Sequence, residues 1–243
     1  MKRIHGGDIY RRTLALLVAM SAAILLAQPS ALCAQEASES LAYPANSAPF
    51  GMTYGDWQAA YLQYMFSIPA SINPVNDLTG ADCNVAQSSS PVFFLNSIAS
   101  GSVTRTCTIP SKALLITAAW AECSNIEPPP SYGANPQDMR TCAATATNGL
   151  GINTLRLTVD GQDLSALLRS LRVQSPYYSF TMPPTDNLLG LEGVTSGWSV
   201  SDGYLVMLKP LPPGNHVIHF AGKFVSGPYG PDPFAVTYNL TVQ

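Results

Sequence analysis

The clearest structural signal in the chain is SDGYLVMLKPLPPGNHVIHF at residues 201–220. Asp202-Gly203 is a turn dipeptide, and residues 212–215 (Pro-Pro-Gly-Asn) give a second turn signal. Both arms are rich in β-branched, aliphatic and aromatic residues, which favours strands. Tyr204–Leu208 is apolar at every position, as is typical of a strand covered on both faces. We therefore expect a β-hairpin at the centre of a packed sheet.

Residues 1–34 have the pattern of a signal peptide. Basic residues precede the apolar run Leu14–Ala27, which is too short for a typical transmembrane span. Small residues then surround Cys33-Ala34-Gln35, so we expect cleavage after Ala34. Arg11-Arg12 leaves twin-arginine export open, and Cys33 leaves a lipoprotein cysteine open. The remaining chain is predicted to be periplasmic or extracellular, without a transmembrane helix.

Removing this leader makes the chain acidic. The leader holds four of the 12 Lys and Arg residues and one of the 15 Asp and Glu residues, which leaves a net charge of about −6. A nucleic-acid-binding protein needs a basic face, so we do not expect that class. The low share of charged residues predicts a sizeable core. We expect a linker or N-terminal arm at 35–50, followed by a single domain at 51–243.

The cysteines predict disulfide bonds. Five are present, and four remain after the leader: Cys83, Cys107, Cys123 and Cys142. An even number in an exported chain indicates two disulfides with three possible pairings. We favour Cys83–Cys107 and Cys123–Cys142 because each closes a modest loop. A metal site would require clustered Cys and His ligands, and no CxxC spacing occurs.

Two helices are predicted. Apolar residues recur with helical spacing at Trp57, Ala60, Tyr61, Tyr64, Met65 and Ile68. We expect Asp56 to be the N-cap of this helix and Pro69 to end it. Its stripe either packs on the sheet or lines a ligand groove with Trp57. The second helix is expected from Asn135-Pro136 to about Thr147.

The rest of the pattern is β. Strand signals cover Pro91–Asn96, Ser102–Ile109, Ala113–Trp120, Ile152–Asp160, Val173–Met182 and Phe234–Val242. With the central hairpin they predict a mainly β fold, a two-sheet antiparallel β-sandwich of jelly-roll type with one or two peripheral α-helices. Arg105 falls on the apolar face of its strand. We expect it to reach the rim or to pair with a carboxylate such as Glu122.

Catalytic residue types are scarce. His216 and His219 are three residues apart, so in a strand they point to opposite faces and do not share a metal. No Gly-x-Ser-x-Gly elbow is present. Hydrolysis of glycosides needs two facing carboxyl groups, and the candidates are Glu122 and Asp56, each with another Asp or Glu. Asp56 also has a capping explanation, whereas Glu122 follows a buried strand, where apolar surroundings would raise its pKa.

The sequence also contains candidate ligand-binding residues. Carbohydrate binding requires exposed flat aromatic side chains, and the candidates are Trp198, Trp57, Tyr177 and Tyr178. Trp198 is the strongest of these because it lies at a loop–strand junction. Asp77 and Asp82, in an oxygen-rich loop, are candidate calcium ligands, although the spacing is not that of an EF-hand. No other cofactor is indicated.

Several motifs resemble an uncharacterised family of exported bacterial proteins. They are Tyr54-Gly55-Asp56-Trp57, Gln63-Tyr64, Ser67-Ile68-Pro69, Asn73-Pro74, Thr104–Pro110, Val173–Pro176 and the 201–222 hairpin, together spanning nearly all of the chain after the leader. The resemblance implies secretion and a single domain. It implies no activity and no catalytic residue.

Two functional hypotheses follow. The first is a non-enzymatic exported β-sandwich that binds an envelope or extracellular ligand, such as a glycan, or has a structural role there. The alternative is a secreted hydrolase that uses Glu122 or Asp56 with another carboxylate. Two carboxylates converging in a cleft would favour the enzyme, and an exposed flat aromatic strip would favour the binding module.

Overall fold

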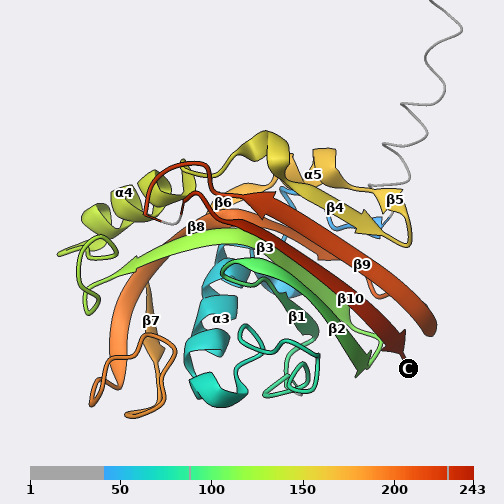
Figure 1. Ribbon diagram of the computed structural model, residues 1–243, viewed down its shortest axis with the longest axis horizontal. Coiled ribbons are helices and arrows are strands. Elements are labelled where there is room, and N and C mark those ends of the chain that lie inside the picture. The colour runs from blue at the N-terminus through green and yellow to red at the C-terminus, as the bar shows by residue number, and fades with distance from the viewer. Residues whose placement is uncertain (1–40, 88, 229) are drawn as a thin grey trace, which may run out of the picture. The chain divides into compact units, whose positions relative to one another are not determined.

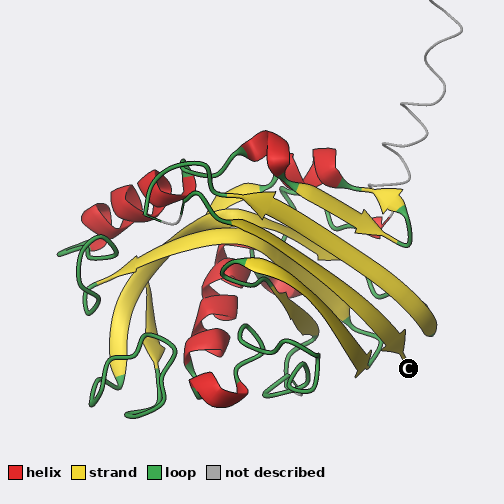
Figure 2. Ribbon diagram, viewed as in Figure 1, coloured by secondary structure: helices red, strands yellow, loops and turns green. Residues whose placement is uncertain are grey.

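The computed structural model describes residues 41–87, 89–228 and 230–243. The expected signal peptide and the first part of the expected linker lie outside this range. Ala42–Gln243 form one compact unit that contains two five-stranded sheets (Figures 1 and 2). No helix in the described part of the chain is long and apolar enough to cross a membrane.

The central part of the first sheet is buried on both faces. The strand order of this sheet is β1-β3-β8-β6, and β7 also pairs with β8. These strands are β1 (Val92–Asn96), β3 (Ala113–Ser124), β6 (Arg172–Gln174), β7 (Tyr178–Thr181) and β8 (Ser196–Leu208). Nearly every residue of β1 and β3 is buried, and so is the second half of β8. The prediction that both faces of Tyr204–Leu208 are covered is therefore confirmed.

The second sheet is buried on one face. Its strand order is β2-β10-β9-β4-β5. These strands are β2 (Gly101–Ile109), β4 (Arg156–Val159), β5 (Gln162–Asp163), β9 (Gly214–Lys223) and β10 (Pro233–Val242). Burial alternates along β2 and β10, so one side packs inward and the other faces solvent.

The two-sheet β-sandwich is confirmed, with two corrections. The sheets are mixed, because β1 pairs parallel with β3 and β10 pairs parallel with β2. Residues 201–220 do not form a hairpin, since β8 belongs to the first sheet and β9 to the second. Pro210, Pro212 and Pro213 have no N–H to donate to a ladder between the two arms, so the chain turns a corner between sheets.

Helices pack on both faces of the first sheet. The helices are α3 (Tyr54–Phe66), α4 (Pro136–Thr147) and the short α5 (Ser165–Ser170), with single 3₁₀ turns at Pro49–Gly51, Ala70–Ile72 and Ile152–Thr154. In Figure 1, α3 lies beneath the curved sheet and α4 lies above β8. Tyr61 of α3 contacts Trp120 of β3, whereas Met139 of α4 packs against Cys123 of β3. These strand residues alternate between faces, as the two-residue period of a strand requires.

One of the two predicted helix N-caps is confirmed and the other is corrected. Thr53 is the N-cap of α3, and Asp56 completes a capping box by accepting from the Thr53 backbone N–H. Asp56 therefore caps α3 from its third position and is not the N-cap itself. For α4, the expected cap is confirmed, because the Asn135 side chain accepts from the N–H groups of Gln137 and Asp138.

Both disulfides have the favoured pairing. Cys83–Cys107 joins the loop before β1 to β2. Cys123–Cys142 joins β3 to α4. Each bond closes a loop of modest length, which restricts the unfolded chain and stabilises the fold.

Arg105 is fully buried and does not pair with Glu122. Its guanidinium donates to the carbonyl oxygens of Asp77 (2.6 Å), Asn96 (2.6 Å) and Val75 (3.1 Å) and to the hydroxyl of Tyr238 (2.8 Å). The expectation that Arg105 reaches the rim or a carboxylate is therefore corrected. The planar group has several N–H donors in a fixed fork, which suits it to join separate segments.

We predict that Arg105→Met strongly destabilises the fold. The substitution leaves buried carbonyl oxygens without donors, so the free energy of unfolding should fall by about 3 kcal/mol or more. Arg156→Met is the control, because Arg156 is exposed on β4, and it should cost less than about 1 kcal/mol. Guanidinium unfolding curves measure both values, and equal losses in the two variants would contradict the structural role of Arg105.

Candidate functional site

Two of the predicted binding aromatics form an exposed stacked pair. Trp198 of β8 is 45% exposed and Tyr177, just before β7, is 38% exposed. Their ring centroids are 4.7 Å apart and the ring planes differ by 18°. Trp198 pairs in register with Ser179, two residues beyond Tyr177, so both rings project from the same face.

Polar groups surround this aromatic pair. The side-chain oxygen of Asn125 accepts from the Trp198 N–H (2.8 Å), and the Asn125 N–H donates to the Trp198 carbonyl (3.1 Å). These two bonds hold the backbone of Trp198 against the end of β3. Exposed hydroxyl side chains at Ser179 and Thr181, in register with Trp198 and Ser196, continue the same strand face. The surface therefore combines flat rings with hydrogen-bonding groups.

The other two aromatic candidates are core residues. Trp57 is buried, and its Nε1 donates to the carbonyl of Pro49 (2.9 Å). Tyr178 is buried on the opposite face of β7 from Tyr177. Neither presents a ring to the surface, so we remove both from the candidate ligand-binding surface. Because Trp57 is buried, the apolar stripe of α3 is better explained by packing on the sheet than by a ligand groove.

A buried carboxyl group lies directly behind the aromatic pair. Glu122 of β3 is 4% exposed and lies opposite Ser201 in the β3–β8 pairing. The Ser199 hydroxyl donates to Glu122 Oε2. Because Ser199 follows Trp198, strand alternation places Trp198 outward and the Ser199–Glu122 contact inward.

The pKa of Glu122 is raised well above its usual value. Burial is the main cause, since it disfavours the charged form. A hydrogen bond and charge repulsion from the Glu127 carboxyl raise it further, and the hydrogen bond from Ser199 opposes the shift. Glu127 in turn accepts from the Ser124 hydroxyl (2.8 Å). A protonated Glu122 can donate a hydrogen bond to the Glu127 carboxyl group.

The two carboxyl groups are not arranged like an open hydrolase site. They converge, but Glu122 is buried and has little access to solvent, whereas Glu127 is half-buried. The Asp56 carboxylate accepts from the backbone N–H and the hydroxyl of Thr53, so its contacts serve the α3 cap. Asp56 and Glu122 therefore have separate hydrogen-bond partners, Thr53 and Ser199, and these contacts do not join them into one site.

The remaining candidates have structural partners. The Asp77 carboxylate accepts from the N–H groups of Thr79, Gly80 and Asp82. Burial raises the pKa of Asp77, but these bonds outweigh it and lower the pKa below its usual value. Loop donors thus occupy oxygens that a calcium ion would need. In the ranges that the structure describes, no three acidic, His or Cys side chains gather as a metal site.

The histidines lie on opposite faces of β9. His216 bonds to Asp160 (2.7 Å) and to the carbonyl of Pro212 (2.8 Å). His219 bonds to the hydroxyl of Thr237 (3.0 Å). This agrees with the prediction from their odd spacing, and each ring has a structural partner.

Sequence reasoning missed Glu127 and Asn125. Both lie in the proline-rich segment after β3, whose composition indicated only a stiff loop. Ser124 bonds to Glu127 and folds this segment back on the strand end. The usable signal was a second acidic residue five positions after Glu122, separated from it by a turn-forming Ser-Asn pair.

We predict that Glu122 makes the fold less stable as pH rises. Its folded pKa lies above its unfolded pKa, so its contribution is complete below about pH 4.3 and is lost as pH rises to the folded pKa, by about 1.4 kcal/mol per pH unit. Glu122→Gln keeps the shape and removes the titration. The free energy of unfolding of this variant, measured relative to the wild type, should therefore increase from pH 5 to pH 8.

Glu192→Gln is the control, because Glu192 is exposed. A pH dependence that is specific to Glu122 should be missing from this variant. A difference from the wild type that stays constant with pH in Glu122→Gln would contradict the raised pKa.

Comparisons with known proteins identify no family for this chain. No family model matches it, and no curated protein matches it. Two solved structures are similar only in part. The cysteine protease inhibitor EhICP2 from Entamoeba histolytica is 14% identical, with 63% of this chain and 96% of that chain covered and a TM-score of 0.23. Amebosin is 12% identical, with 58% and 96% covered and a TM-score of 0.17. Scores this low support no argument about fold or function.

Proposed function

We propose that this protein is an exported, non-enzymatic β-sandwich module that binds a glycan through Trp198 and Tyr177. The observation that carries the proposal is the exposed stacking of these two rings on one strand face. Carbon–hydrogen faces of sugars pack on flat aromatic rings, while sugar hydroxyls take hydrogen bonds from neighbouring polar groups. Ser179 and Asn125 are polar residues beside the pair.

The energetics of the two rings also support a binding surface. A large aromatic ring left exposed gains free energy when a ligand removes it from water, and Trp and Tyr are frequent energetic centres of interfaces. The two Asn125 bonds hold the backbone of Trp198, and the stacking contact with Tyr177 helps to hold its ring. A prearranged pair loses less conformational entropy when the ligand binds.

Export is supported by covalent structure as well as by the leader. Disulfides persist in oxidising compartments such as the periplasm or the extracellular space, and the described chain contains two. The hydrolase alternative has weaker support. Its best candidate, Glu122, is only 4% exposed, which does not suit direct contact with a polysaccharide chain.

We predict that Trp198→Ala weakens retention on an insoluble polysaccharide by about tenfold or more, as expected for loss of a central aromatic contact. Tyr177→Ala should weaken retention by a smaller factor. The melting temperature should change little, because both side chains are exposed. Depletion assays with a panel of polysaccharides and envelope fractions measure retention.

Tyr132→Ala is the matched control, since Tyr132 is 46% exposed outside the pair, and it should bind as the wild type does. Unchanged retention in Trp198→Ala would remove the pair from the binding surface. Soluble sugar is measured in the same tubes. Release that disappears in Glu122→Gln would overturn the non-enzymatic proposal in favour of the hydrolase.

A further inference from the structure

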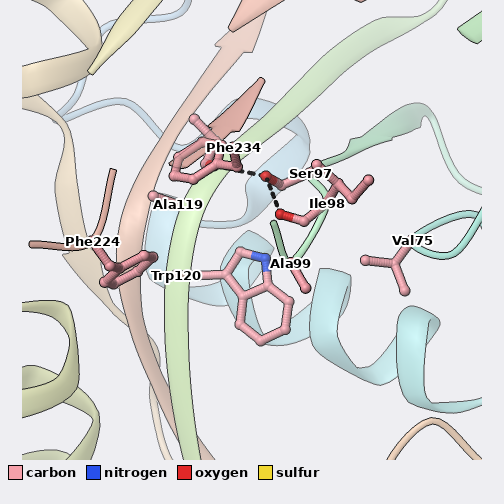
Figure 3. Close-up of a pocket in the computed structure, with 9 residues that line it drawn as sticks. Val75, Ser97, Ile98, Ala99, Ala119, Trp120, Phe224 and Phe234 are labelled. Carbon is pink, nitrogen blue, oxygen red and sulfur yellow. Dashed lines mark hydrogen bonds between the residues drawn. The ribbon is translucent and has the colours of Figure 1, made fainter. Parts of the chain in front are cut away.

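An apolar pocket opens beside β3, away from the aromatic pair (Figure 3). Its volume is about 160 Å³. It is lined by Val75, Ser97, Ile98, Ala99, Ala118, Ala119, Trp120, Phe224 and Phe234. These residues come from β3, from the loops before and after β1, from the residue that follows β9 and from the start of β10. The pocket therefore lies where the two sheets meet.

Backbone geometry explains why this space is open. β1 ends at Asn96, and the chain then leaves the first sheet to reach β2 at Gly101. β3 continues past this point and has a register irregularity between Thr117 and Ala119. The side chains at positions 118 and 119 are both alanine, so they leave space that a larger residue would fill.

The walls of the pocket are uncharged and aromatic. Three aromatic rings line it, those of Trp120, Phe224 and Phe234. Figure 3 shows the indole of Trp120 among the lining side chains. The polar side-chain groups on these walls are the Ser97 hydroxyl and the indole N–H of Trp120. The Ser97 hydroxyl donates to the carbonyl of Ala118 (3.0 Å), which leaves the hydroxyl oxygen as an acceptor. A charged ligand would find no partner on these walls.

A second recess provides an outer compartment. It has a volume of about 390 Å³ and shares Val75, Ile98 and Ala99 with the pocket. Asn76 and Ser100 add polar groups to its lining. Both spaces are mainly apolar, because Leu78 and Leu188 also line the recess, and its polar groups come from Asn76 and Ser100. Such a lining suits a largely apolar compound with one polar substituent.

We propose that this pocket binds a neutral compound with a single aromatic ring of about the size of phenol. An apolar protein cavity of ~150 Å³ accommodates benzene. Three aromatic walls favour a ring over an alkyl group, because aromatic pairs gain energy beyond the area that they bury. The ring lies against Trp120, Phe224 and Phe234, and the polar substituent points toward the outer recess.

Phenol is the probe for the test, titrated into isotope-labelled protein and followed by NMR. The resonances of Ala118, Ala119 and the Trp120 indole should shift with one common saturation curve. Cyclohexanol has similar size without aromaticity and should bind about two- to tenfold more weakly. The Trp198 indole should not move, which separates this pocket from the proposed glycan surface.

Ala99→Phe places a ring at the shared wall of the two spaces and should abolish the phenol shifts. Ala99 is exposed, so the fold should tolerate the change. Val217→Phe is the matched control, because Val217 is 47% exposed on β9 outside the pocket, and it should bind phenol as the wild type does.

Three results would overturn the proposal. They are no shifts at these residues up to the solubility limit of phenol, equal binding of phenol by Ala99→Phe, and equal affinity for cyclohexanol. If Ala99→Phe fails to fold, the wild-type shift map and the cyclohexanol comparison still decide the question.

Discussion

The buried guanidinium of Arg105 is the interaction on which most of this structure depends. It joins β2 to the loop before β1, to the end of β1 and to β10 through hydrogen bonds to Asp77, Asn96 and Tyr238. A buried charge is costly unless its donors are satisfied. Each contact therefore constrains a segment that has little regular structure of its own. The Val75 and Ser97 carbonyls are also acceptors, so Arg105 helps to place two walls of the apolar pocket.

The second organising feature is the double burial of the first sheet. With α3 on one face and α4 on the other, β3 and β8 place neighbouring residues in unlike environments. Trp198 is exposed, whereas the next residue, Ser199, bonds to a buried carboxyl group. The proposed binding surface and the buried Glu122 cluster are thus two faces of the same strands.

Much of the fold was predictable because local signals and long-range packing agree. The all-apolar run Tyr204–Leu208 indicated a doubly covered strand, and Asn135-Pro136 indicated the start of α4. The hairpin and the antiparallel sheets were wrong in detail. Strand pairing depends on which partner covers each edge, and no local pattern records that choice. Pro210, Pro212 and Pro213 suggested the turn of a hairpin, but in the structure they lie where the chain passes from one sheet to the other.

Local patterns in the chain were enough to predict the β class and the positions of α3 and α4, and loop length favoured the disulfide pairing that the structure shows. Periodicity, capping residues and loop closure act over short distances along the chain, and so they can be read there. Only the tertiary structure decided which aromatics face water, that Glu127 reaches Glu122, and that a pocket opens beside β3. Exposure, pKa and cavity volume depend on groups distant in sequence, and these become neighbours only when both sheets have packed.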